Sequence, residues 1–193
     1  MTVESLQQRA EDHLRFIREA MGRASSFTAI PGWGGVLMGT TALVAAVLAG
    51  RTSGEQQWLE IWLADAAIAV PLGAVTMAHK ARRVGVDLAR GTGRLFVFVL
   101  MPPIIAGGVL TVALAARGDY ELLPAMWLLL YGTALVVGGV FAVRLVPVMG
   151  GGFMFLGALA AVAPLHIGNL LLAVGFGMLH IVSGVLVIRR YGG

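Results

Sequence analysis

Six runs of apolar residues, each about as long as a membrane-spanning helix, dominate this sequence. They extend over Trp33–Gly50, Trp58–Ala78, Leu95–Ala116, Leu122–Val143, Pro147–Pro164 and Gly168–Ile188. Roughly 20 mostly apolar residues cover the hydrocarbon of a bilayer as a helix. Hydrophobic residues make up 58% of the 193-residue chain and charged residues only 12%, which is untypical of a soluble domain. We expect an all-α bundle of six transmembrane helices, paired as three αα-hairpins because the connections are short.

Lysine and arginine fall almost entirely on one side of this arrangement. Of the 14 basic residues, only Arg51 and Arg117 fall at the opposite helix ends. Cytoplasmic ends of spanning helices carry the excess of basic residues. We therefore expect a multi-pass protein of the bacterial cytoplasmic (inner) membrane with both termini in the cytoplasm.

The largest connection on the basic side covers residues 79–94. Its basic residues are Lys80, Arg82, Arg83, Arg90 and Arg94. They would anchor the topology, or bind anionic lipid headgroups or an acidic protein surface. The net charge of +4 does not indicate direct nucleic-acid binding, because the basic residues lie beside apolar spans.

Residues 1–24 have an amphipathic pattern. Apolar residues recur at helical spacing from Val3 to Met21, and four acidic residues balance the arginines between them. We expect a cytoplasmic amphipathic helix that packs on the bundle, on a second copy of the chain or on a cytoplasmic protein partner, or that only lies on the membrane surface. Residues 25–32 would form a hinge before the bundle of residues 33–193.

The hinge leads into the sequence PGWGG. Pro31 suits the first turn of a helix, Trp33 suits the aromatic belt at the membrane interface, and Gly32 and Gly34 permit close approach of other helices. We expect these four residues to set how the N-terminal helix lies across the bundle.

Parts of the last two hairpins align after a shift of 45 residues. Gly132 then falls on Gly177, and Gly139 falls on Gly184. Such a parallel repeat would place three hairpins around an axis normal to the membrane. The alternative is a chance alignment of helices rich in glycine, alanine and valine.

Two ionisable residues, Asp65 and His180, fall deep inside predicted spans. An ionisable group is costly in hydrocarbon, so each is a candidate functional residue. At 1.5 Å per residue their depths differ by only roughly 5 Å, and they could form a pair. Together with Trp62, they are candidates to bind a proton, a cation or a polar ligand. The alternatives are a packing pair, or two residues that never meet.

Most enzyme classes find little support. The chain has no cysteine, which excludes cysteine nucleophiles and thiolate metal sites. His79 and His180 lie at different depths, which disfavours a haem held by two histidines. Ser183 and His180 are three residues apart on one helix, whereas a nucleophile and its base converge from separate elements. We expect no catalytic residues, no cofactor and no metal site. Asn169 would cap the last span, or else face the outer surface.

The stretch HLRFIREAMGRASSFTAIPGWGGVLMG, His13–Gly39, resembles the opening of an uncharacterised family of small bacterial six-span integral membrane proteins. The resemblance covers 27 residues and implies the six-span fold. It brings no activity and no site residues with it.

Two functions follow as expectations, with an enzyme that acts on lipid as a third. The first is a membrane sensor or regulatory or scaffold subunit, which binds a partner protein or a second copy through its cytoplasmic face. The second is a small-molecule or ion transporter with a midplane site at Asp65 and His180. A transporter predicts a polar cavity that reaches Asp65, whereas a tightly packed midplane would argue against one.

Overall fold

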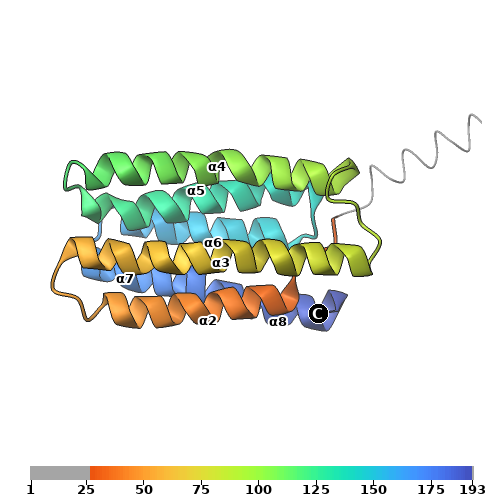
Figure 1. The fold of residues 1–193 in the computed structure, drawn as a ribbon, viewed down its shortest axis with the longest axis horizontal. Helices are drawn as coiled ribbons and strands as arrows, with labels where there is room; N and C mark the ends of the chain where they lie inside the picture. Colours follow the sequence, from red (N-terminus) through yellow and green to blue (C-terminus); the bar gives the residue numbers. More distant parts are fainter. Residues whose placement is uncertain (1–26, 193) are drawn as a thin grey trace, which may run out of the picture.

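The computed structural model describes residues 27–192, in which six helical segments run side by side (Figure 1). The first three are α2 (Gly32–Ala49), α3 (Glu55–Arg83) and α4 (Gly91–Ala115). The fourth comprises η1 (Tyr120–Leu122), α5 (Leu123–Gly138) and η2 (Gly139–Phe141), and the fifth is α6 (Leu145–Ala160). The last comprises α7 (Leu165–Leu172), the π-helical η3 (Ala173–Leu179) and α8 (His180–Tyr191). The predicted all-α architecture is confirmed for this part of the chain, and the predicted amphipathic helix lies outside it.

Five of the six segments are long and apolar enough to cross a membrane. The exception is α6, whose 16 residues would extend about 24 Å at 1.5 Å per residue, less than the ~30 Å of hydrocarbon. The corresponding apolar run, Pro147–Pro164, is one of the two shortest of the six. The chain is therefore a polytopic helical membrane protein in its overall construction.

The connection between α3 and α4 is shorter than predicted. Helix α3 continues to Arg83 and α4 begins at Gly91, so the turn comprises only residues 84–90. The predicted loop of residues 79–94 is wrong at both ends. The helix can continue past its apolar core because lysine and arginine in a last turn interact favourably with the negative end of the helix dipole.

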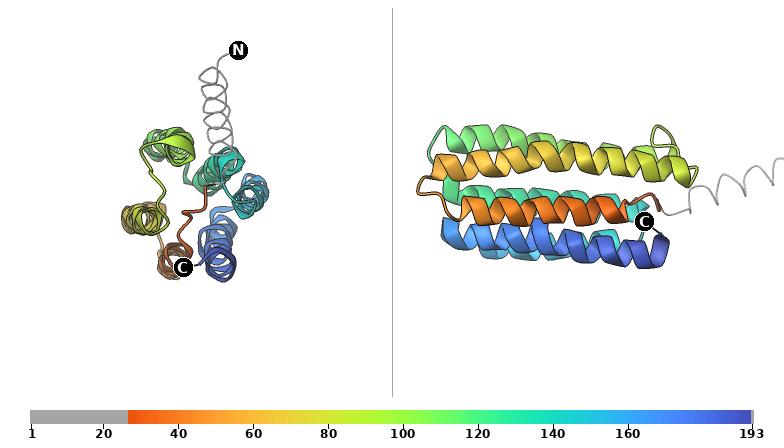
Figure 2. Two further views of the ribbon diagram at one scale, coloured as in Figure 1. Left: turned by 90° about the vertical axis from the view of Figure 1, so that its right-hand side faces the viewer. Right: turned by 60° about the horizontal axis from the view of Figure 1, so that its bottom comes forward.

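The helices form a ring in chain order (Figure 2). Helix α2 packs against α3, α4 against α5, α5 against α6, α6 against α7 and η3, and α8 returns to α2. One neighbouring pair, α3 and α4, does not pack along its length. The ring therefore has five closed interfaces and one that is not closed by helix packing.

Glycines bring two of the closed interfaces together. A Cβ atom on Gly150 of α6 would lie 2.7 Å from the carbonyl oxygen of Gly132 in α5. A Cβ atom on Gly184 of α8 would lie 2.6 Å from the carbonyl oxygen of Gly32 in α2. Such contacts let helix backbones approach each other where lipid provides no hydrophobic drive for association.

The segment before α2 lies inside the ring, at the end of the bundle where α2 begins (Figure 2). The Phe27 N–H donates to the carbonyl oxygen of Phe141 at 2.7 Å, and the Phe27 ring stacks on that of Phe96 at 4.8 Å between centroids. Phe27 and Ala29 are fully buried.

We call the end of the bundle where α2 begins the basic end, because most of the lysine and arginine side chains of residues 27–192 lie there: Lys80, Arg82, Arg83, Arg90, Arg94, Arg144, Arg189 and Arg190.

Candidate functional site

A cavity of about 300 Å³ occupies the place where α3 and α4 fail to pack, and we call it the α3–α4 cavity. Its walls are mostly apolar. Leu63 and Val70 of α3 and Ile104 of α4 line it and are exposed on the outer surface of the bundle. The cavity therefore opens sideways, toward the region that lipid would occupy.

All three predicted ligand-binding residues line this cavity: Asp65, His180 and Trp62. Asp65 and Trp62 come from α3, and His180 comes from the first turn of α8 on the opposite wall. The cavity brings the three residues to one site, but its lining is mostly apolar, whereas the transporter hypothesis predicted a polar cavity.

The proposed pair of Asp65 and His180 does not form. His180 instead shares a hydrogen bond with the Tyr131 hydroxyl of α5, with 2.9 Å between the oxygen and Nε2. Asp65 is partly buried, and the Thr41 side chain of α2 lies next to it. The Thr41 hydroxyl also donates to the carbonyl oxygen of Met38 at 2.9 Å. Helical spacing could not predict Tyr131 as the partner of His180, because the two residues lie 49 positions apart on different helices.

His180 is held in an aromatic cluster. The rings of Tyr131, Phe153 and Phe176 lie 5.5, 5.5 and 6.1 Å from the His180 ring, centroid to centroid. Within residues 27–192, Nδ1 of His180 has no partner with full hydrogen-bond geometry, although the carbonyl groups of Gly175 and Phe176 in η3 lie beside it. Single π-helical turns often occur at functional sites, and here one sets the position of His180.

Two further polar groups complete the cavity wall. The indole N–H of Trp127 donates to the Thr111 hydroxyl at 2.8 Å, and that hydroxyl donates to the Gly107 carbonyl oxygen. Thr111 and Trp127 both line the cavity. Sequence reasoning did not single out either residue, because the contact between Trp127 and Thr111 joins two helices and leaves no local pattern in the sequence.

Asn169 is an important residue that sequence reasoning placed wrongly. It does not cap a helix. Its side chain is buried, and its Oδ1 accepts hydrogen bonds from the indole N–H groups of Trp58 and Trp62, each at 2.9 Å. Its Nδ2 donates to the carbonyl oxygen of Ala46 at 3.0 Å. This cluster ties α2, α3 and α7 together and fixes the α3 wall of the cavity on the side of Trp62.

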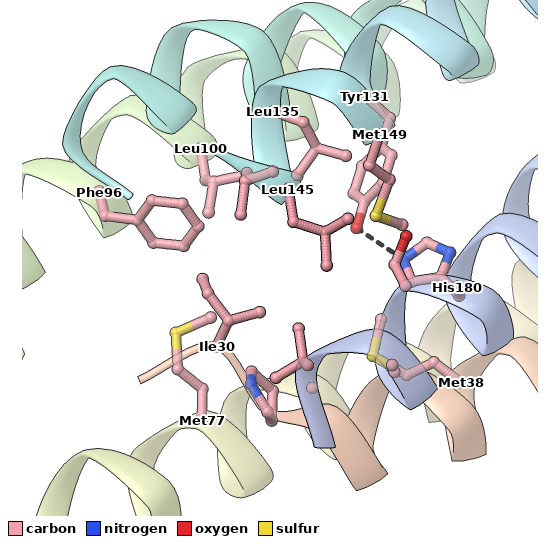
Figure 3. Close-up of a pocket in the computed structure, with 17 residues that line it drawn as sticks. Ile30, Met38, Met77, Phe96, Leu100, Tyr131, Leu135, Leu145, Met149 and His180 are labelled. Atoms are coloured by element: carbon pink, nitrogen blue, oxygen red, sulfur yellow. Dashed lines mark hydrogen bonds between the residues drawn. The ribbon is translucent and has the colours of Figure 1, made fainter. Parts of the chain in front are cut away.

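A second cavity of about 120 Å³ lies toward the basic end, and we call it the basic-end cavity (Figure 3). It shares Met38, Tyr131 and His180 with the α3–α4 cavity. Ile30 and Pro31, from the segment before α2, line it as well. The hydrogen-bonded pair of Tyr131 and His180 thus stands between two consecutive cavities.

The predicted hinge residues lie in close packing. Gly32 packs on Ile188 of α8, Gly34 packs on Thr76 of α3, and Pro31 directly precedes α2. Trp33 points outward and is 61% exposed. Whether this segment moves as a hinge stays a prediction.

The predicted basic loop is divided between helix ends. Lys80 is only 5% exposed, and its ammonium group donates to the carbonyl oxygen of Gly192. Arg90 pairs loosely with Asp87 at 3.8 Å. Arg82, Arg83 and Arg94 are exposed in the terminal turns of α3 and α4. Lys80 therefore holds the end of the chain instead of offering a free positive charge.

Comparison with known proteins identifies no relative. No protein-family model, no curated protein and no solved structure matches this chain.

Proposed function

We propose that this protein is a membrane transporter for a small, largely apolar molecule that enters the α3–α4 cavity sideways from the bilayer. The lateral cavity is the observation that supports the proposal most strongly. Ligand sites are typically concave and mostly apolar, with a few polar groups that orient the ligand. Here Asp65 and the Tyr131–His180 pair would be those groups.

The succession of two cavities favours transport over simple binding. A molecule leaving the α3–α4 cavity toward the basic end would meet Met38, Tyr131 and His180, which line both cavities. Breaking the Tyr131–His180 hydrogen bond would join them, in the manner of a gate. In this proposal the basic end faces the cytoplasm, as the distribution of arginine and lysine favours.

Photolabelling of the full chain in lipid nanodiscs tests the binding step. The probe is a phenyl diazirine, and mass spectrometry maps the labelled residues. We expect saturable labelling on the cavity faces of α3 and α4, which an excess of unlabelled probe analogue suppresses. The Ala66→Phe substitution fills the cavity and should abolish this labelling. Ala67→Phe, one residue further on the exposed face of α3, is the matched control and should keep it. Labelling spread evenly over all outward faces would refute the proposal.

The role as a sensor is a second candidate, and one observation favours it. Ile30 and Pro31 line the basic-end cavity, so a molecule bound there would touch the segment that leads to residues 1–26. A bound ligand could thereby change how the basic end of the bundle contacts a cytoplasmic protein or a second copy of the chain.

Single-cysteine variants distinguish the two functions, because the chain has no native cysteine. Ser183 lines the basic-end cavity, and Thr28 is exposed in the segment before α2. For a transporter, Ser183→Cys should react with a membrane-impermeant maleimide, and a ligand in the cavity should change the rate. For a sensor, Ser183→Cys should stay unreactive, while a spin label on Thr28→Cys should change its mobility when the ligand binds.

A further inference from the structure

We infer that the molecule bound in the α3–α4 cavity is a small lipophilic organic cation, a protonated or quaternary amine, and that Asp65 is its counter-ion. The inference rests on the proposed function and names the substrate class of the same site. Three properties of the cavity support it: an acidic group without a basic partner, walls rich in aromatic rings, and a size that suits a compact ligand.

Asp65 has no positive partner in the described part of the chain. Lys80, the nearest lysine or arginine on α3, lies fifteen residues further along the helix, roughly 22 Å at 1.5 Å per residue. Its ammonium group is bonded to the carbonyl oxygen of Gly192. The other lysine and arginine side chains of residues 27–192 lie at the helix ends or in the connections, and His180, in the same cavity, is bonded to Tyr131. A charge in hydrocarbon is costly unless it is paired, so a cationic ligand would supply what the protein lacks.

Four aromatic residues share the cavity with Asp65: Trp62, Trp127, Tyr131 and Phe176. The indole N–H groups of Trp62 and Trp127 are bonded to Asn169 and Thr111, so these rings offer the cavity carbon surface instead of hydrogen-bond donors. Aromatic faces attract ammonium groups, and quaternary ammonium ligands are commonly bound this way. An anionic ligand would meet a carboxylate and few donors, so the chemistry of the lining disfavours it.

The size of the cavity limits the ligand. Its volume of about 300 Å³ is about twice that of an apolar cavity of ~150 Å³ that takes up benzene. One aromatic ring with a short, substituted ammonium group matches this volume. Phenethyltrimethylammonium is such a molecule, and 3,3-dimethylbutylbenzene is its neutral carbon isostere with nearly the same shape.

The two compounds provide the experiment. Their binding to the full chain in nanodiscs is measured with radiolabelled ligand, for the wild type, Asp65→Asn, Asp65→Glu and Glu60→Gln. Glu60 is an exposed acidic residue of α3 outside the cavity and serves as the matched control. We expect the wild type to prefer the cation by roughly tenfold or more, since its ammonium group gains both the carboxylate and the aromatic faces. Asp65→Asn should lose this preference, Asp65→Glu should keep part of it, and Glu60→Gln should keep all of it.

The outcomes separate the inference from the proposed function. Binding of the neutral isostere with equal or higher affinity in the wild type overturns the inference and leaves the binding cavity standing. An unchanged cation preference in folded Asp65→Asn also overturns it, and would mean that the carboxylate carries only a proton. If neither compound binds and the diazirine labelling is likewise absent, the proposed function itself fails. If Asp65→Asn does not fold, the affinities of the wild type for the cation and for its neutral isostere still test the inference.

Discussion

Asn169 makes more hydrogen bonds between helices than any other side chain of residues 27–192. Its removal should therefore lower the free energy of unfolding. Asn169→Leu keeps the approximate volume but leaves the indole N–H groups of Trp58 and Trp62 buried without an acceptor. Hydrogen bonds between membrane helices contribute about 0.6–2 kcal/mol each. We expect the free energy of unfolding in micelles to fall by about 2 kcal/mol, measured by circular dichroism during denaturation.

Thr133→Val is the control for this substitution. Thr133 is exposed on α5, and its hydroxyl bonds only to the carbonyl oxygen of Leu129 in the same helix. The change should cost less than about 0.5 kcal/mol. Equal losses for Asn169→Leu and Thr133→Val would show that the asparagine does not hold α2, α3 and α7 together.

The sequence identified the right residue types for the candidate site but not their partners. Asp65 and His180 stand out because ionisable groups are rare in spans, and Trp62 because it lies near Asp65 at helical spacing. All three line one cavity. Asn169 was misplaced because the last helix begins at Leu165, not Gly168, which moves Asn169 from the helix end to the second turn. Its partners are 107 and 111 residues away in the chain, beyond any local pattern.

Close packing of α5 on α6 depends on glycine at defined positions, and two neighbouring glycines of α6 test this. A Cβ atom on Gly150 would lie 2.7 Å from the carbonyl oxygen of Gly132, whereas one on Gly151 would meet nothing within 4 Å. We expect Gly150→Ala to lower the free energy of unfolding by about 1–3 kcal/mol through overpacking. Gly151→Ala should be neutral or stabilising by up to about 1 kcal/mol, because alanine favours helix. Denaturation in micelles measures both, and a similar effect of the two substitutions would contradict this packing.

The segment before α2 should behave as a fixed element of the bundle. Phe27 is buried, stacks on Phe96 and donates its backbone N–H to Phe141. Phe27→Ala removes the ring but keeps the backbone bond, and should cost about 3–5 kcal/mol if the ring is as well packed as a core phenylalanine. Thr28→Ala, at an exposed position next to it, is the control. Thermal unfolding in micelles that does not separate the two variants would mean that the segment is only loosely attached.

Helix positions were easier to predict than helix partners. The apolar runs located all six segments, but they did not show which faces meet, as Gly39 of α2 and Gly177 of η3 do. The gap between α3 and α4 was not predictable, because apolar residues cover all sides of α4 and no periodicity marks a packing face. Consecutive helices with a short turn between them usually pack, and here the cavity takes the place of that contact.

The ring gives a physical meaning to the alignment of the last two hairpins. Gly132 and Gly177, which coincide after the 45-residue shift, both pack on the next helix around the ring: α6 for Gly132 and α2 for Gly177. The corresponding interface of the first hairpin would be α3 with α4, and it is the open one. A three-hairpin ring with two closed junctions and one open junction has a single lateral entrance, which is the geometry that the proposed function requires.

The two ends of the ring differ in charge, and this difference predicts its orientation in the membrane. Arginine and lysine concentrate at the basic end, whereas Arg51 and Arg117 lie near the acidic Glu55, Asp119 and Glu121 at the other end. From the positive-inside rule we predict that the basic end faces the cytoplasm.

Two single-cysteine variants report the orientation, at Gly54 between α2 and α3 and at Ala89 between α3 and α4. Both positions are exposed, and a Cβ atom on Gly54 would meet nothing within 4 Å. We expect a membrane-impermeant maleimide to label Gly54→Cys in intact cells and Ala89→Cys only after permeabilisation. The reverse labelling pattern would contradict the predicted orientation and place the basic end outside the cytoplasm. It would also reverse the proposed path, so that the basic-end cavity would open away from the cytoplasm while the lateral entrance between α3 and α4 would remain within the bilayer.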